Sequence, residues 1–299
     1  MGHFITDLKE SFSRGNIYIQ FIYINVGVFV FTSLLSVFLL LFNRSSGSML
    51  LYLELPASVQ SFLYQPWTLF TYMFMHAGFM HILFNMLWLY WFGSLFLYFF
   101  SAKHLRGLYI LGGICGGLFY MIAYNVFPYF QHAIQSSYLL GASASVLAIV
   151  VATAYREPNY PVRLLFLGTI RLKYIALIMV LTDLLFMTSD NAGGHIAHIG
   201  GALSGWWFAA GISKGYDITK LINIILDGFL KLFDKKTYKH KNKTTMKVNY
   251  NRDPRDYDYN ARKKEQSDEI DRILDKLKAS GYESLTTEEK KNLFDASKK

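Results

Sequence analysis

Cysteine and acidic residues are both scarce in this chain of 299 residues. Its single cysteine, Cys115, excludes an intramolecular disulfide framework. Asp and Glu number 21 against 30 Lys and Arg, which gives a formal net charge of +9. Hydrophobic residues nevertheless make up 53% of the chain, so basic and apolar residues must be segregated along it. The apolar runs end near Ile212, and a polar, Lys-rich tail begins at Lys214.

The first apolar run lacks the small-residue cleavage site of a secretory signal peptide. We expect this run, Ile17 to Phe42, to be retained as a span, because it is long enough to cross a bilayer of about 30 Å. Five further spans are predicted at about residues 78–100, 105–127, 143–155, 174–187 and 193–212. The sequence thus predicts an all-α polytopic membrane protein. Its parts are a cytoplasmic segment (1–16), a bundle of six transmembrane helices (17–212) and a cytoplasmic C-terminal tail (213–299).

Basic residues in the loops orient this bundle. Lys and Arg are concentrated after the second and fourth spans, whereas Arg44 stands alone in the three loops of the opposite face. The positive-inside rule therefore places both termini in the cytoplasm and the starts of spans two, four and six near the outer face. We expect a multi-pass protein of a bacterial inner membrane. The segment from Asn43 to Met75 has no run of spanning length and is expected to lie partly in the membrane interface.

The fourth span is too short to cross the membrane. Thirteen residues from Ser143 to Tyr155 extend about 20 Å, so Ser143 begins roughly 10 Å below the outer surface. Irregular backbone at that depth is tolerated only where protein buries it or where it lines a wet cavity. Asn85 and His198 lie at a similar depth on spans two and six, and polar side chains inside a membrane favour a functional role.

Two ladders of small residues select Ser143 over its neighbour Ser145. They are Ala144, Ala148 and Ala152 on span four, and Ala197, Gly201 and Gly205 on span six. If these ladders pack together, helix rotation of about 100° per residue turns Ser143 and His198 to the same side. Ser145 then points to the other side of the seam. A serine beside a histidine forms a nucleophile and its base, with oxyanion donors expected from the Ser143 N–H, His81 and Asn85.

These residues resemble the rhomboid intramembrane serine proteases. The resemblance covers about residues 17–212 and rests on three motifs, His76–Asn85, Gly141–Ala144 and Ala197–Gly205. It implies a catalytic dyad of Ser143 and His198, oxyanion contacts from His81 and Asn85, and substrates that are single transmembrane helices. We also assign Gly141 and Ala142, which precede the nucleophile, to the oxyanion or substrate-binding site. No metal or organic cofactor is implied.

The chain departs from the family pattern at three positions. Thr68 replaces the Arg of the usual Trp-Arg pair, Ala144 replaces the Gly after the nucleophile, and Leu147 replaces an aromatic residue that often stacks on the catalytic histidine. Asp183 invites a triad interpretation, but a structural hydrogen bond to nearby backbone or a hydroxyl is favoured. His76 and His195 are interpreted as cavity-lining or loop-anchoring residues.

The tail is expected to contain an amphipathic helix at 218–233, whose apolar stripe and following Lys cluster (235–247) favour binding to membrane lipid rather than to nucleic acid. Residues 249–265 are charged and are expected to be flexible. Two short helices are predicted at 269–278 and 287–297, with a capping box from Thr286 to Glu289. This hairpin is a candidate for partner binding or self-association.

Two alternative functions remain open at this point. One is a transporter or carrier of metal ions, using His76, His81, His195 and His198 as ligands. The other is a proteolytically inactive relative that only binds transmembrane helices. The retained Ser143 and His198 argue against it, but the Ala144 and Leu147 departures keep it open.

Overall fold

The structure, a computed structural model, describes residues 16–44, 47–164, 168–233 and 254–296. The chain divides into two compact units, Met1–Lys235 and Lys236–Lys299, and each is described by itself. The expected cytoplasmic segment before residue 16 and the Lys cluster at 235–247 lie outside the described residues.

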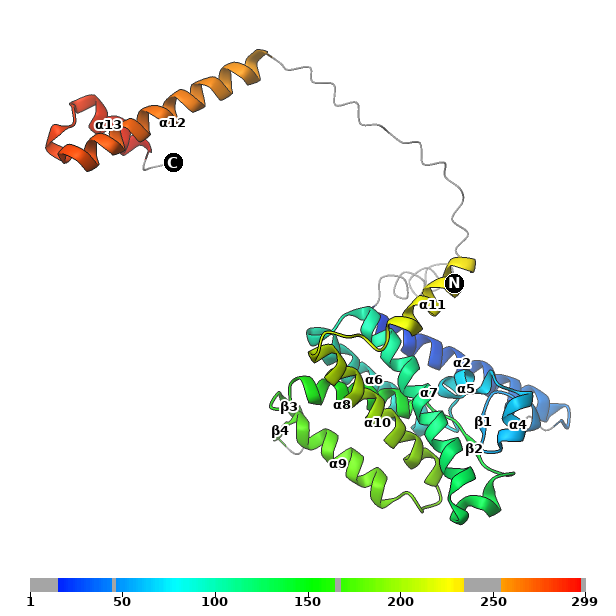
Figure 1. Cartoon of the computed structure of the whole chain (residues 1–299). Helices are drawn as coiled ribbons and strands as arrows, with labels where there is room; N and C mark the ends of the chain where they lie inside the picture. The colour runs from blue at the N-terminus through cyan, green and yellow to red at the C-terminus, as the bar shows by residue number, and fades with distance from the viewer. Residues whose placement is uncertain (1–15, 45–46, 165–167, 234–253, 297–299) are drawn as a thin grey trace. The chain divides into compact units, whose positions relative to one another are not determined.

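The first unit is a bundle in which helices occupy all six ranges where spans are expected (Figure 1). They are α2 (Ile17–Leu41), α6 (Phe79–Phe99), α7 (Ala102–Val126), α8 (Ser143–Arg156), α9 (Leu172–Leu185) and α10 (Ala192–Ser213). Within the described part of the chain, α2, α6 and α7 are long and apolar enough to cross a membrane, and α8 is a shorter apolar helix.

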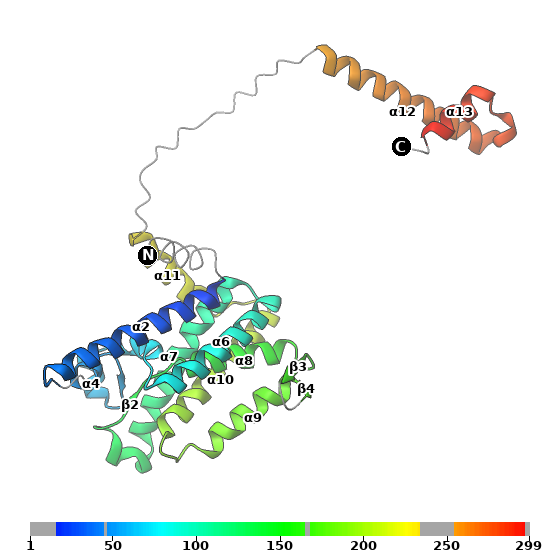
Figure 2. The same ribbon diagram turned by 180° about the vertical axis from the view of Figure 1, so that it is seen from behind.

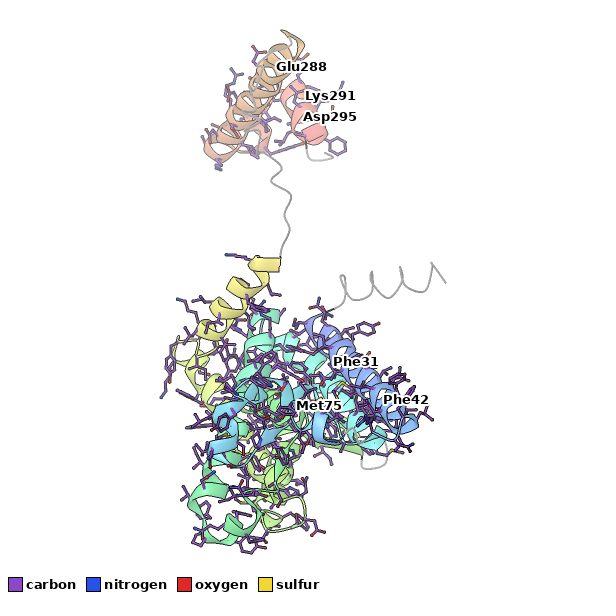
Figure 3. All side chains as sticks on the ribbon, turned by 90° about the vertical axis from the view of Figure 1, so that its right-hand side faces the viewer. Phe31, Phe42, Met75, Glu288, Lys291 and Asp295 are labelled. Atoms are coloured by element: carbon purple, nitrogen blue, oxygen red, sulfur yellow. The ribbon has the colours of Figure 1, made fainter. Side chains whose placement is uncertain are left out.

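Helix α2 shows why the unit needs lipid around it. It is apolar on every face, yet few of its side chains are buried. Phe31 and Phe42 are 67% and 64% exposed, whereas Met75, on the segment before α6, is 4% exposed (Figure 3). A helix that exposes apolar side chains over most of its surface is stable in hydrocarbon, where all its backbone hydrogen bonds remain internal. The protein is an integral membrane protein.

In its described residues, the segment between α2 and α6 contains no helix of spanning length and consists of short elements. These are α3 (Gly47–Leu50), β1 (Leu55–Pro56), α4 (Val59–Tyr64), α5 (Thr68–Thr71) and the 3-10 helix η1 (Tyr72–Phe74). Strand β1 pairs antiparallel with β2 (Tyr138–Leu139), which follows the 3-10 helix η2 (Pro128–Ala133). This pairing fastens the first loop to the segment that leads into α8.

The chain is mostly helical, as predicted, but its loops also contain two small sheets that the sequence did not predict. Besides β1 and β2, an antiparallel hairpin of β3 (Pro161–Leu164) and β4 (Gly168–Arg171) joins α8 to α9. Backbone N–H and C=O groups in a loop must find partners, and a hairpin satisfies them locally. The short strands are too brief to produce a clear period-two pattern in the sequence.

Helices α7, α8 and α10 pack through small residues, and both views show them side by side (Figures 1 and 2). A methyl group added at Gly201 would overlap the Ala144 carbonyl, and one at Gly205 would overlap the Ala148 carbonyl. From the α7 side, Gly112 faces Ala148 and Gly116 faces Ala144. The predicted packing of the two ladders is therefore confirmed, with α7 closing a third side.

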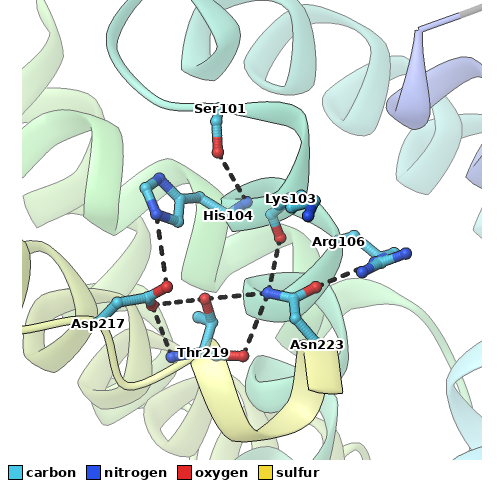
Figure 4. Close-up of polar contacts among 7 residues, drawn as sticks. All are labelled: Ser101, Lys103, His104, Arg106, Asp217, Thr219 and Asn223. Atoms are coloured by element: carbon cyan, nitrogen blue, oxygen red, sulfur yellow. Dashed lines mark hydrogen bonds and ion pairs between the residues drawn. The ribbon is translucent and has the colours of Figure 1, made fainter. Parts of the chain in front are cut away.

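Helix α11 (Lys220–Phe233) confirms the amphipathic helix expected after the bundle. Its polar face docks on the start of α7, where the Asn223 amide donates to the Lys103 carbonyl and accepts from the Arg106 guanidinium, both at 3.0 Å (Figure 4). The Arg106 guanidinium also binds Asp227 at 2.6 Å. Ser101, His104, Asp217 and Thr219 extend this polar network. The opposite face exposes apolar side chains, namely Leu221, Ile224 and Ile225.

The second unit is a helical hairpin of α12 (Pro254–Ser280), the 3-10 helix η3 (Tyr282–Ser284) and α13 (Thr287–Ala296). Ile273 and Leu285 are buried in it, while Glu288, Lys291 and Asp295 lie on the solvated face of α13 (Figure 3). The prediction of a flexible segment through residue 265 was wrong, because α12 begins at residue 254. Its charged run has few apolar residues, but Ala, Arg, Lys, Glu and Gln all favour helix.

The predicted capping box is confirmed at the start of α13. The Thr286 backbone N–H donates to Glu289 Oε2 at 2.7 Å, and the Glu289 N–H donates to the Thr286 hydroxyl at 3.3 Å. Lys276 of α12 also binds the Glu289 carboxylate at 2.9 Å. One carboxylate therefore caps α13 and joins the two helices.

We expect the hairpin to loosen at acidic pH through Glu289. The hydrogen bond from the Thr286 N–H and, to a smaller extent, the one from Lys276 lower the pKa of Glu289 to about 2. The pKa of a Glu side chain in an unfolded chain is about 4.3. Because the folded-state pKa is depressed, this stabilisation is complete above about pH 4.3 and is lost as the pH falls toward 2. Protection of α13 amides from hydrogen exchange in the full chain, corrected for intrinsic rates, should fall more steeply over this range than in Glu289→Gln. Equal pH dependence in the two proteins would contradict the assignment.

Candidate active site

A cavity of about 350 Å³ lies among α6, α8, α9 and α10. Ser143, His198, His81 and Asn85 all line it, so the structure brings together the four polar residues singled out from three separate spans. Leu147 and five apolar side chains that the sequence did not single out complete the wall: Met80, Phe84, Trp88, Val146 and Met179. Apolar residues within a span give no signal that distinguishes a cavity wall from a lipid-facing surface.

Ser143 is the first residue of α8, and it is partly exposed whereas Ala144 to Val150 are buried. Ser145 is fully buried and faces α7, because its hydroxyl would lie 2.9 Å from a Cβ at Gly113. The rotation of α8 therefore separates the two hydroxyls as the ladder argument predicted. Of the two serines, only Ser143 lines the cavity.

The turn before Ser143 requires glycine at position 141. Gly141 has φ +127°, a conformation that residues with a Cβ rarely adopt, and its N–H donates to the Tyr72 carbonyl at 2.9 Å. A Cβ here would also lie 3.0 Å from Nε2 of His81 and 3.6 Å from Oγ of Ser143. Ala142 is fully buried, and its carbonyl accepts the first hydrogen bond of α8, from the Val146 N–H. Gly141 and Ala142 thus shape the approach to Ser143.

His81 and Asn85 lie one turn apart on α6. His81 Nδ1 accepts a hydrogen bond from the Ala77 N–H at 3.4 Å, which assigns the proton of the neutral ring to Nε2, on the side of Gly141 and Ser143. The Asn85 amide donates to the His81 carbonyl at 2.9 Å and so fixes its own orientation. Its second amide hydrogen remains as a donor.

His76 does not line the cavity and instead supports His81 from behind. It is buried, and its ring lies edge-on to that of His81 with 5.1 Å between centroids. Burial, with a smaller contribution from His81, lowers the pKa of His76 to about 4. His76 is therefore neutral at physiological pH.

His198 contacts a carboxylate that the sequence did not place beside it. Asp183 Oδ1, on α9, lies 2.8 Å from Nδ1 of His198 and 2.8 Å from Nδ1 of His195. The expected bond from Asp183 to backbone or a hydroxyl was wrong. No pattern in the sequence fixes which face of α9 packs on α10, so the contact could not be predicted.

The three departures from the family pattern have different surroundings. Thr68 is fully buried, and its hydroxyl donates to the Gln65 carbonyl at 2.7 Å, so this side chain has a local structural partner. Ala144 lies in the small-residue seam between Gly116 and Gly201. Leu147 lines the cavity together with His198.

The metal-carrier alternative required four histidines to gather. Among the described residues, one group of three or more side chains has metal-ligand spacing, and it consists of Asp183, His195 and His198. His76 and His81 fall outside this group. The four histidines therefore do not gather at one place. His195 and His198 lie beside Asp183, whereas His76 and His81 contact each other.

Comparisons with known proteins agree with the three motifs. The Rhomboid domain family model matches residues 64–215, and a family of unknown function (DUF6576) matches residues 255–299. Over 157 residues the chain is 29% identical to "RHOMBOID-like protein 12, mitochondrial" of Arabidopsis thaliana. The matched region covers 50% of this chain and 47% of that protein. The chain thus spans about half the length of that relative. The rhomboid family includes intramembrane serine proteases, and this chain, matched over half its length by the family model, belongs to the rhomboid family.

Proposed function

We propose that this protein is an intramembrane serine endopeptidase that cleaves single-span transmembrane proteins near the outer face of the membrane. The observation that carries the proposal is the cavity shared by Ser143 and His198, on two helices whose backbones touch through Gly201 and Gly205. Ser143 acts as the nucleophile and His198 as the general base. A nucleophile and a base that line one cavity from two closely packed helices support covalent catalysis there.

In the acylation step, the Ser143 hydroxyl attacks the scissile carbonyl carbon while its proton passes to Nε2 of His198. The carbonyl electron pair moves onto oxygen, where the Ser143 N–H, His81 Nε2–H and the Asn85 amide donate hydrogen bonds. The positive end of the α8 dipole adds to this stabilisation. When the C–N bond breaks, His198 returns the proton to the leaving amine. Water, activated by His198, then hydrolyses the ester.

The short α8 supports a wet site within the membrane. Its 14 residues extend about 21 Å, less than the hydrocarbon thickness of about 30 Å. We assign six spans to α2, α6, α7, α8, α9 and α10, with both termini cytoplasmic and a bacterial inner membrane as the location. Basic side chains at one end of the bundle support this orientation, among them Lys103, Arg106, Arg156 and Lys173.

The chemistry of the cavity wall supports an apolar peptide substrate. Met80, Phe84, Trp88 and Met179 present apolar surface beside the nucleophile. A transmembrane helix must locally unwind to offer its carbonyl to Ser143, so residues that are small or that loosen a helix are favoured at the cleavage site. The proposed steps need no metal or organic cofactor.

The parts beyond the bundle are proposed to attach the enzyme to its surroundings. The exposed apolar face of α11 suits the headgroup region of the cytoplasmic leaflet, and the basic run that follows it suits anionic lipid. Lipid explains this run without nucleic acid. The α12–α13 hairpin is proposed as a site for a protein partner or for self-association.

One observation favours a second candidate, a proteolytically inactive member that binds transmembrane helices. Leu147 lines the cavity where many family members have an aromatic residue that stacks on the catalytic histidine. A leucine cannot provide the ring stacking that orients an imidazole.

The His198→Ala variant distinguishes the enzyme from the inactive binder. We expect it to lose cleavage of a model single-span substrate by at least about 10³-fold, because Ser143 then has no base. It should still co-purify with that substrate in detergent as wild type does, because the apolar side chains of the cavity wall are unchanged. Wild-type protein that binds a panel of such substrates and cleaves none would instead establish the inactive binder.

A further inference from the structure

Asp183 reaches the site from α9, and we propose that it is a positioning residue for the general base His198, with His195 holding Asp183 in place. This inference rests on the proposed function and extends it from two residues to a Ser143, His198 and Asp183 relay. The family resemblance implies only the dyad, so the role of Asp183 comes from the geometry of this chain.

The contacts of Asp183 are specific and sheltered. Its side chain is 8% exposed, and those of His195 and His198 are 19% and 22% exposed. The two histidines are three positions apart on α10, so both side chains lie on one face of that helix. A single oxygen, Oδ1, lies 2.8 Å from Nδ1 of each ring. The carboxylate therefore sits between two imidazoles and cannot turn without losing both bonds.

These distances favour hydrogen bonds over a metal centre, although the same three side chains form a possible ligand set. Zinc binds nitrogen and oxygen at about 2.0–2.2 Å in tetrahedral geometry, which separates neighbouring ligand atoms by roughly 3.3 Å. A distance of 2.8 Å is instead typical of an N–H donor on a charged oxygen. Each of the three groups thus already has a partner that suits its chemistry.

The hydrogen bond decides which nitrogen of His198 acts as the base. An ionised carboxylate only accepts, so His198 Nδ1 carries the proton and Nε2 keeps its lone pair for the Ser143 proton. After that transfer the ring is positively charged, and the adjacent carboxylate stabilises it without taking a proton itself. Asp183 thereby provides the ring orientation that stacking on Leu147 cannot provide.

The test compares Asp183→Asn with wild type on one single-span substrate. We expect kcat to fall by about 10²- to 10⁴-fold with KM changed less than about threefold, because the amide no longer holds the Nδ1–H tautomer. Asp183→Glu should recover part of the loss, since it restores the acceptor. Asp190→Asn, which changes an exposed carboxylate between α9 and α10, is the matched control and should behave as wild type.

A second readout does not depend on proteolysis. In protein labelled at histidine with ¹⁵N, we expect two hydrogen-bonded Nδ1 protons shifted downfield. One should disappear in His195→Gln and both in Asp183→Asn. If neither signal exists, the arrangement is overturned whether or not the protein is a protease.

The remaining outcomes separate this inference from the proposed function. If Ser143→Ala abolishes cleavage but Asp183→Asn retains the wild-type kcat, only the role of Asp183 is overturned. A loss in Asp183→Asn that appears entirely in KM, or that matches a loss of folded protein, also overturns it. If chelator lowers wild-type activity to the level of Asp183→Asn, the three side chains act through a metal and the inference fails.

Discussion

Ser143→Ala should lower cleavage of a single-span substrate by at least about 10³-fold, because it removes the nucleophile and leaves only the donors around the carbonyl. Ser145→Ala should retain the wild-type rate within about threefold. Ser145 is buried against α7, and its hydroxyl has no hydrogen-bond partner among the described residues. Removing a buried hydroxyl that lacks a partner does not lower stability. Two serines that are two residues apart on one helix thus have opposite expected effects.

Purified proteins in detergent provide the measurement, with initial cleavage rates taken with and without chelator. The serine mechanism requires that chelator has no effect on wild type. Thermal unfolding of each variant controls for folding. Cleavage by Ser143→Ala at the wild-type rate, or an equal loss in Ser145→Ala, would refute both the mechanism and the helix rotation that separates the two hydroxyls.

Gly201→Ala is the second change with a large expected effect. Its new methyl group would overlap the carbonyl, the carbonyl carbon and the Cα of Ala144, which are backbone atoms and cannot change rotamer. Overpacking of this kind costs about 1–3 kcal/mol, more than the gain of up to about 1 kcal/mol from alanine in a helix. Since Ala144 adjoins the nucleophile, any shift also displaces Ser143 from His198. We expect kcat/KM to fall by about 10²-fold or more.

Gly27→Ala is the matched control, because it also lies within a helix but a Cβ there has nothing within 4 Å. It should leave activity unchanged and keep or slightly raise the thermal unfolding midpoint in detergent. Comparison of the midpoints and cleavage rates of the two variants isolates the close approach of α8 and α10. A Gly201→Ala protein as stable and active as Gly27→Ala would show that the seam accommodates a methyl group.

The sequence predicted which side chains of α8 and α10 face the cavity because helix geometry is local and regular. Small residues spaced by four define a seam, and the direction of every other side chain on the same helix follows from it. This placed Ser143 and Ser145 on different sides of α8 before any contact was known. The amphipathic helix α11 and the capping box of α13 followed from equally local patterns.

Contacts between separate elements could not be predicted in this way. The place of Asp183 depends on the rotation of α9 against α10, and α9 carries no ladder of small residues to fix it. The β1–β2 pairing joins residues more than eighty positions apart through two-residue strands, so neither strand has a recognisable pattern. The start of α12 was missed because a charged, apolar-poor run has the composition of a flexible segment.

The glycine seam has a mechanical consequence for the proposed protease. Where two helices meet backbone to backbone, their spacing is set by hard atomic contact and by no adjustable side chain. We therefore expect α8 and α10 to tilt together as one rigid unit when the lipid thickness or the temperature changes. The side chains of Met179 and Phe84 in the cavity wall must then move to admit a substrate.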